Sequence, residues 1–519
     1  MKLSKSVMFG AAACLLSTSA SAQAAGDLLA LSQYNYSFST ARSAALGGAF
    51  TSLGADLSSM SINPAGLGMY MSSDFGISPS LTWNNMQSTY LGTKSDDSRT
   101  RFTLGNLGMA FNLYQGSGTL TSFTLGVGYS KLADFNTTSA AYGQGIDKSI
   151  TDVLAEYMNG VPLSSLGHPD NDPYQPFRRA DVGLWGGILA YQTGILDPMS
   201  DAQDNKQYTV ANNLATGSRT NPSMRNVNKG SIDEYSISGG FNIQNILYLG
   251  FTIGIQDILY RNDNYYAETY DNNSLPLNGM NYIRSLHLDG TGVNFKFGAV
   301  VRPIENLRIG VAVHTPTLVS INEEYIEWMS ADYKNTARGE LLDSPRSLNE
   351  YDINTPTRLL TGISYTLPGV GLITADYERV WYNRMKLRNM GTENWDFQQT
   401  INNEVSSFYQ PANNFRVGIE ATPAQNFYIR AGYANYGECI ATRDAFNNMS
   451  SINSYENYSA GLGFRFQNMY VDLAYIYTEY KYAPYTMFYY GDPDYVVNPG
   501  NVETKQSRNT ITMSVGVRF

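Results

Sequence analysis

Apolar and polar residues alternate with a period of two along most of the chain from Asp74 to its end. Because successive side chains of a strand point to opposite faces, this alternation predicts strands with one apolar and one polar face. The last strand shows it best, with apolar Ile511, Met513, Val515, Val517 and Phe519 separated by polar or small residues. The pattern predicts strands at 74–90, 100–114, 118–133, 231–244, 247–261, 284–302, 306–319, 355–367, 370–385, 412–422, 426–436, 455–466, 469–483 and 506–519.

The connections between these strands alternate between short and long without exception. The tight ones lie at 115–117, 244–245, 303–305, 367–369, 422–425 and 466–468, whereas 262–283, 320–354, 386–411, 437–454 and 484–505 are long and polar. Short turns on one side and long loops on the other are typical of transmembrane barrels, which close because lipid offers no hydrogen bonds to a sheet edge. We therefore expect an all-β fold, a 14-stranded antiparallel transmembrane barrel with both chain ends on the periplasmic side. A large soluble β-sandwich or a secreted β-repeat protein is the alternative.

The apolar phase should face lipid and the polar phase the lumen. Charges of both signs occur in the polar phase, so they can pair across strands, and Glu378 with Arg416 is one candidate pair. We interpret these charges as holding wall and plug together, and direct contact with a ligand is the alternative. The lumen set comprises Lys296, Arg308, Arg358, Asp376, Glu378, Arg416, Glu420, Arg430, Arg465 and Asp472.

Two features interrupt the alternation near the start of the barrel. Pro79 lies in mid-strand, where it cannot donate a ladder hydrogen bond. In the second strand the apolar phase slips by one residue around Gly105 and Asn106, as a β-bulge would produce. We expect a local kink in this wall, and a wrong register assignment is the alternative.

The first 22 residues have the pattern of a secretory signal. Lys2 and Lys5 precede an apolar run, and Ala20-Ser21-Ala22 fits a cleavage site, which places the chain outside the inner membrane. A lipoprotein signal at Cys14 is the alternative, although the apolar run continues past it. The formal charge of −10 argues against binding to nucleic acid. Cys439 has no partner for a disulfide once Cys14 leaves with the signal.

Residues 23–73 do not alternate and predict a compact plug of short helices. They contain a Gly/Ala-rich run at 43–50, an acidic residue at Asp56 and the turn Asn63-Pro64-Ala65-Gly66. This segment resembles the start of the FadL family of outer-membrane transporters for long-chain fatty acids and other hydrophobic compounds. A second similar stretch covers 298–316, and Phe519 is similar to the terminal aromatic residue of outer-membrane barrels.

The resemblance implies a signal peptide at 1–22, an N-terminal hatch at 23–73 and a barrel at 74–519 in the outer membrane of a Gram-negative bacterium. It implies passive movement of an apolar ligand, which leaves through an opening in the wall. Pro79, Gly105 and Asn106 are candidates for that opening, although family members kink the third strand. The expected partners are a hydrophobic ligand such as a fatty acid, outer-membrane lipid and the barrel-assembly machinery, and the expected state is a monomer.

The connection 134–230 is far longer than the others and is expected to be an extracellular insertion. It contains an apolar stretch, and exposed apolar patches often mark binding sites. We predict a ligand groove formed by Leu184, Trp185, Ile188 and Leu189. The alternative is a small core within the loop, formed with Leu154, Tyr157 and Met158.

No chemistry of a catalytic or metal site stands out. The histidines lie on different predicted elements, and nucleophile-elbow and phosphate-loop motifs are absent. We expect no enzymatic activity, no cofactor and no bound metal. The alternative functions are a non-specific porin and an outer-membrane lipid hydrolase.

Overall fold

The computed structural model describes residues 25–35, 38–166, 172–210, 219–271, 277–334, 341–391, 394–441, 451–492 and 495–519. The predicted signal peptide lies outside the described residues. Every neighbouring pair of wall strands is antiparallel, and the last strand pairs back onto the first, so the barrel is closed. The predicted 14-stranded barrel is confirmed. In order around the wall its strands are β1 (Asp74–Tyr90), β2 (Thr93–Gln115), β3 (Leu120–Asp134), β7 (Thr220–Ile243), β8 (Leu247–Tyr270), β9 (Leu277–Ile304), β10 (Leu307–His314), β14 (Arg358–Leu367), β15 (Gly371–Trp381), β17 (Pro411–Ala424), β18 (Phe427–Tyr436), β19 (Ile452–Phe466), β20 (Met469–Tyr482) and β24 (Asn501–Arg518).

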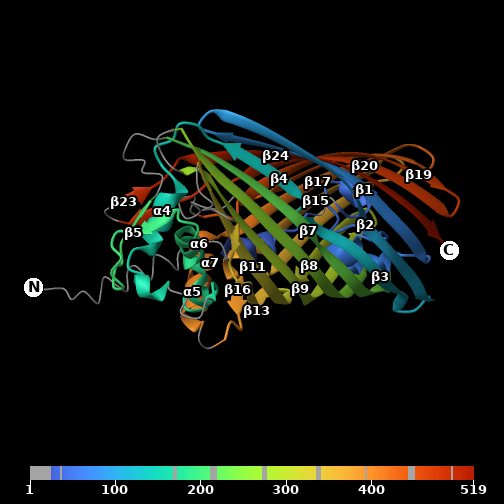
Figure 1. The fold of residues 1–519 in the computed structure, drawn as a ribbon. Coiled ribbons are helices and arrows are strands. Elements are labelled where there is room, and N and C mark those ends of the chain that lie inside the picture. Colours follow the sequence, from blue (N-terminus) through green and yellow to red (C-terminus); the bar gives the residue numbers. More distant parts are fainter. Residues whose placement is uncertain are drawn as a thin grey trace, which may run out of the picture.

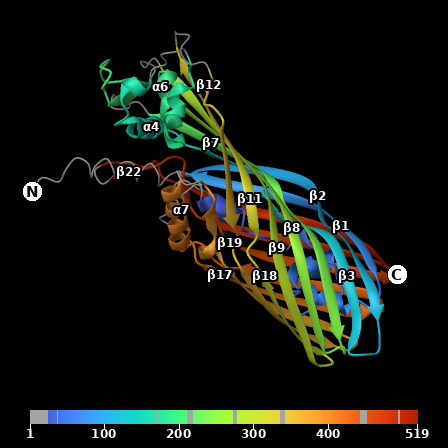
Figure 2. The ribbon, with the colours of Figure 1, turned by 90° about the horizontal axis from the view of Figure 1, so that it is seen from below.

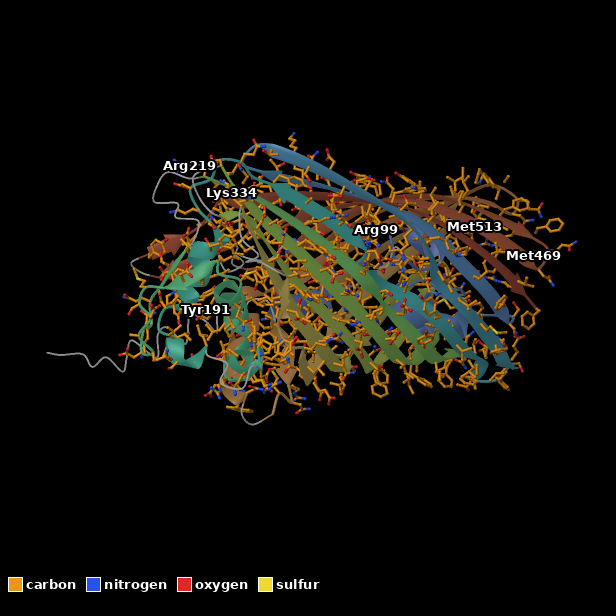
Figure 3. The ribbon with its side chains drawn as sticks, in the orientation of Figure 1. Arg99, Tyr191, Arg219, Lys334, Met469 and Met513 are labelled. Atoms are coloured by element: carbon orange, nitrogen blue, oxygen red, sulfur yellow. The ribbon has the colours of Figure 1, made fainter. Side chains whose placement is uncertain are left out.

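The outer face carries the predicted apolar belt. On β8, Leu249, Phe251, Ile253 and Ile255 are exposed while the residues between them are covered, and Asp257 is the first charged residue of this outward row. Met469 and Met513 are exposed on the outer wall and are labelled near the C-terminal end in Figure 3. Such a belt fits the hydrocarbon layer of a bilayer. Among the described residues, no helix is both long and apolar enough to cross a membrane.

The two ends of the barrel differ as the connections predict. Figure 1 shows the C-terminus at one end, which we call the turn end, and the larger helices at the other, which we call the loop end. Several turns at the turn end use left-handed backbone conformations, for example Gln244 and Asn245 at φ 53° and 57°. Such residues match the twist of tight antiparallel hairpins.

Two expectations about the loop end were wrong. The connection after β1 is not long, because β1 and β2 pair from Tyr90 to Thr93 across a turn of Leu91 and Gly92, both with positive φ. Residues 262–283 and 320–354 are largely strand, since antiparallel pairing continues outside the belt. Residues 386–411 form the long connection expected, and it contains a helix. The extra elements here are β4 (Thr137–Tyr142), β11 (Leu318–Tyr333), β12 (Leu342–Asp343), β13 (Ser347–Asn354), η6 (Tyr382–Arg384), β16 (Lys386–Arg388), α7 (Trp395–Phe408) and β21 (Tyr485–Thr486).

The long connection after β3 contains a helical domain, which lies on the extended strands at the loop end. Figure 2 shows its helices on one side of the loop end, separate from α7. Its elements are α4 (Ile150–Met158), η3 (Leu163–Ser165), α5 (Gln175–Arg178), η4 (Val182–Leu184), α6 (Trp185–Gln192), β5 (Leu196–Pro198) and β6 (Tyr208–Val210), with the hairpin of β22 (Tyr490–Asp492) and β23 (Tyr495–Val497) in a later loop.

The described residues before β1 lie inside the barrel, and we call residues 25–35 the N-terminal segment. Residues 25–30 are helical and are followed by α2 (Ala41–Ala45), α3 (Ser59–Ile62) and η2 (Pro64–Met69) before β1 begins. Phe519 lies at the turn end, where it pairs with Ser73, but Ala25 packs near residues of α7 at the loop end. The expectation that both ends lie on the periplasmic side is therefore wrong for the first described residue, because the segment runs along the lumen.

Candidate functional site: the barrel interior and its side wall

Within the predicted hatch at 23–73, residues 38–70 fill the half of the lumen nearer the turn end, and we use the name hatch for this part from here on. Its predicted turn is buried, and the Asn63 side chain holds it by accepting from Ala65 N at 3.1 Å and donating to Thr51 O at 2.6 Å. Pro64 then opens η2, where its fixed φ suits the first turn of a helix. The sequence pattern thus predicts this local structure, and tertiary contacts place it.

Two wall glycines allow the turn to lie directly on the sheet. A Cβ atom on Gly250 would lie 2.2 Å from the carbonyl carbon of Pro64, and one on Gly298 would lie 1.8 Å from Asn63 Oδ1. Neither distance is compatible with a side chain. The hatch therefore contacts the backbone of β8 and β9 without an intervening layer of side chains.

Charged groups of the wall bind the hatch and one another. Arg42 of the hatch contacts Glu420 at 3.3 Å, and Glu420 also contacts Arg430 at 2.6 Å. Asp376 accepts hydrogen bonds from the backbone N and Oγ1 of Thr51, at 2.8 and 2.7 Å. The predicted pair of Glu378 with Arg416 is present at 3.4 Å. The interpretation that lumen charges hold wall and plug together is confirmed at these contacts.

The lumen nearer the loop end is apolar, which the prediction of a polar lumen missed. Leu28, Leu29 and Leu31 of the N-terminal segment are at most 3% exposed and pack against inward-facing apolar residues of the wall and of α7. We call this region the apolar compartment; its wall and loop residues include Ile232, Ile258, Leu288, Val319, Ile321, Ile353, Val380, Ile401 and Val405. The sequence does indicate this apolar region. Near the loop end the strands lose the alternation of apolar and polar residues, as at Ile258 beside Leu259.

Four contacts hold the N-terminal segment at the floor of this compartment. Arg358 donates to Ser32 O at 2.6 Å, and its guanidinium lies 4.1 Å from the centroid of the Tyr34 ring. The Tyr34 carbonyl accepts from Tyr455 OH at 2.7 Å. Asn35 N donates to Leu132 O of β3 at 2.7 Å. The segment is thus tied to opposite parts of the wall at once.

The backbone ladder of the wall is interrupted beside this compartment. Residues 93–104 of β2 pair with β1, and the β2–β3 ladder begins only at Asn106 and Ser130. On the other side β3 bulges: Lys131 and Ala133 face adjacent residues of β7, and Leu132 is the extra residue. β4 then continues on β7. We call this interruption, between 93–105 and 131–142, the ladder break.

Leu132 links the ladder break to the apolar compartment. Its side chain is 4% exposed and belongs to the compartment's cluster, together with Ala133. Its carbonyl, freed by the bulge, accepts the hydrogen bond from Asn35. Bulges re-aim side chains in this way. The kink in β3 therefore brings the side wall, the N-terminal segment and the compartment together.

The predicted kink residues lie at the lower end of the ladder break. Ser78 pairs with Asn106 and Pro79 with Leu104, so Gly105 is the extra residue of a bulge. Asn106 Nδ2 donates to Ser130 Oγ at 2.9 Å, at the last pair before the break. A Cβ on Gly105 would lie 2.7 Å from Phe38 O, so the hatch contacts this point as well. Sequence reasoning found this bulge and missed the second one in β3.

The residues predicted to form a ligand groove pack into a core in this structure. Trp185, Ile188 and Leu189 are at most 5% exposed and form a core with Leu154 and Met158 of α4. Their neighbour Leu184 is partly buried against the same core. This is the alternative arrangement considered from the sequence. A ligand groove at these residues stays a prediction that would require α4 and α6 to separate.

Within the described ranges no group of three His, Cys, Asp or Glu side chains could hold a metal ion. His314 is buried and faces inward, where Nε2 lies 2.9 Å from Ile62 O of the hatch. His314 therefore links the wall to the hatch.

Comparison with known proteins finds solved structures of similar architecture. No family model matches the chain, and no curated protein matches it. Among solved structures, the P. putida toluene transporter TodX aligns with a TM-score of 0.51 and 13% identity over 94% of this chain and 99% of that one. A Pseudomonas aeruginosa FadL homologue aligns with a TM-score of 0.52 and 11% identity over 94% and 98% of the two chains.

The chain has the FadL fold. The likeness covers barrel and hatch together, so the resemblance noted in residues 43–67 and 298–316 is matched at the level of architecture. A closed barrel with this exposed belt is the architecture of outer-membrane proteins. At this identity the FadL fold does not by itself assign a substrate.

Proposed function

We propose that this protein is an outer-membrane channel for passive uptake of a small hydrophobic molecule, such as a long-chain fatty acid or an aromatic hydrocarbon. The molecule would occupy the apolar compartment and leave sideways, through the ladder break, into the outer-membrane lipid. The observation that carries the proposal is the bulge at Leu132, where compartment and wall interruption meet. TodX, named a toluene transporter, shares the fold and supports the hydrophobic class.

A lateral route suits the physics of such a cargo. The hatch blocks the straight path with buried backbone and paired charges, which an apolar molecule would have to desolvate and displace. The side wall at β3 offers apolar residues on the inner side and the lipid belt outside. The packed hatch also argues against the non-specific porin. The outer-membrane location, the monomeric state and dependence on the barrel-assembly machinery belong to the same proposal.

Deleting Leu132 tests the route. Lys131 and Ala133 already face adjacent residues of β7, so the deletion should straighten β3 and close the ladder break. We expect uptake of radiolabelled oleate or toluene by intact cells to fall to the level of cells lacking the protein. The measurement is the initial uptake rate, with heat-modifiable migration in gels confirming a folded barrel.

Leu132→Ala is the matched control. It keeps the bulge and the carbonyl that binds Asn35 but removes the side chain, so uptake should persist. If the deletion variant fails to fold, deleting Gly105 removes the other bulge and serves the same test. A folded deletion variant that transports like the unmodified protein would overturn the lateral route.

A further inference from the structure

Asp27 places a carboxyl group inside the apolar compartment. It lies in the helix of residues 25–30, beside Leu28 and one turn from Leu31, and is 8% exposed. Burial disfavours the ionised form of a carboxyl group, because the protein does not replace the hydration that it loses.

The neighbour that acts on Asp27 most directly is another carboxylate. Glu323 of β11 is held in acceptor geometry by Tyr351 OH at 2.9 Å and Asn349 Nδ2 at 3.0 Å. Hydrogen bonds donated to a carboxylate favour its charged form. Burial first, and then the charge of Glu323, raise the pKa of Asp27 well above its ordinary value. Glu323 lies past Leu318, where the exposed apolar row of that strand ends.

The other groups around Asp27 do not neutralise it. Tyr260, Tyr351 and Tyr409 are phenols that stay protonated at physiological pH. Burial raises the pKa of Cys439 to about 12, so this thiol is neutral as well. Glu404 of α7 is a further acid on this side. Arg358, the nearby cation, is engaged by Glu378 at 3.3 Å and by Ser32 O.

The geometry points to a charge-driven release of the N-terminal segment: ionised Asp27, repelled by Glu323, drives residues 25–31 out of the apolar compartment. When Asp27 is protonated, the segment stays seated and the compartment is filled by the chain itself. When Asp27 ionises, the helix leaves for water and the compartment is free for a hydrophobic ligand. The inference rests on the proposed function only for what then enters the compartment.

The sign of the pH dependence follows from linkage. The seated state binds the Asp27 proton more tightly than the released state, in which this carboxyl has an ordinary pKa. Seating is therefore favoured at low pH, and it is lost as the pH rises through the raised pKa. Between the ordinary pKa and the raised pKa of Asp27, the equilibrium constant for release should increase by up to about tenfold per pH unit.

Hydrogen–deuterium exchange of peptides covering 25–35 measures release in the purified, full-length mature protein without any ligand. After correction for intrinsic rates, exchange in the unmodified protein should increase with pH, and Asp27→Asn should abolish the increase. Glu323→Gln should make the increase smaller and end it at lower pH, because the seated segment then tolerates ionised Asp27 better. Glu404→Gln is the control and should leave the response of 25–35 in place.

An Asp27→Asn protein whose segment titrates like the unmodified one would overturn the inference, as would a response abolished by Glu404→Gln instead. If Asp27→Asn does not fold, Glu323→Gln decides the question alone: an increase as large as that of the unmodified protein would overturn the inference. A pH-dependent segment in a protein that transports nothing would refute the proposed function and leave this inference standing.

Discussion

Gly298 shows at the residue scale how closely hatch and wall approach. Its neighbours in β9 follow the alternation, and the sequence predicts the strand and the Asn63 turn separately. Their meeting depends on a glycine opposite the turn, and nothing in the local pattern distinguishes Gly298 from other strand glycines. Similarly, the Pro79–Gly105 bulge follows from a visible phase slip, whereas the bulge at Leu132 leaves the alternation of β3 hard to read because Leu132 and Ala133 are both apolar.

Gly298→Val should displace the hatch turn. The added side chain would overlap Asn63 Oδ1, and overpacking of this kind costs about 1–3 kcal/mol. We expect the purified barrel to unfold at lower temperature and to show higher ion conductance in planar bilayers. Ala299→Val, on the outward phase of the same strand, is the control and should change neither. An unchanged conductance in folded Gly298→Val would contradict the close contact described here.

At the scale of elements, strand periodicity predicts the barrel strands, but it does not predict the segments that pack against their inner face. Outward residues of β8 alternate cleanly because lipid selects one phase, and the inward phase near the loop end is apolar because the N-terminal segment and α7 pack there. Strands also continue beyond the belt, since backbone pairing does not need a membrane. The helix α7 lies in a polar stretch, where its apolar face is short, whereas α6 lies in the apolar stretch of 134–230 and packs against α4.

The helix α7 should loosen as the pH rises. Burial raises the pKa of Glu404 to about 7, so the packed helix favours the protonated acid. The stability that protonated Glu404 gives to the packed helix is fully present below the ordinary pKa of a glutamate, and it is lost as the pH rises through about 7. Exchange of peptides from 395–408 should therefore increase between about pH 6 and 8, and Glu404→Gln should remove that dependence. Equal pH dependence in both proteins would show that Glu404 does not control the packing.

At the scale of the whole molecule, the structure separates three environments along one barrel. The belt faces lipid, the hatch region joins wall and plug through paired charges, and the compartment near the loop end is apolar and borders the β3 bulge at Leu132. The sequence predicted the first two environments from the two strand phases. The third depends on the N-terminal segment running back along the lumen, a path that local patterns do not encode.

The central claim is that a hydrophobic molecule travels through the apolar compartment and the ladder break. A diazirine-bearing hydrocarbon probe, activated by light in intact outer membranes, tests it directly when the adducts are mapped by mass spectrometry. The account predicts adducts on inward-facing Leu132, Ile232 and Val380, reduced by an excess of unlabelled ligand. Adducts confined to lipid-facing residues such as Ile253, with none on the inward set, would contradict it.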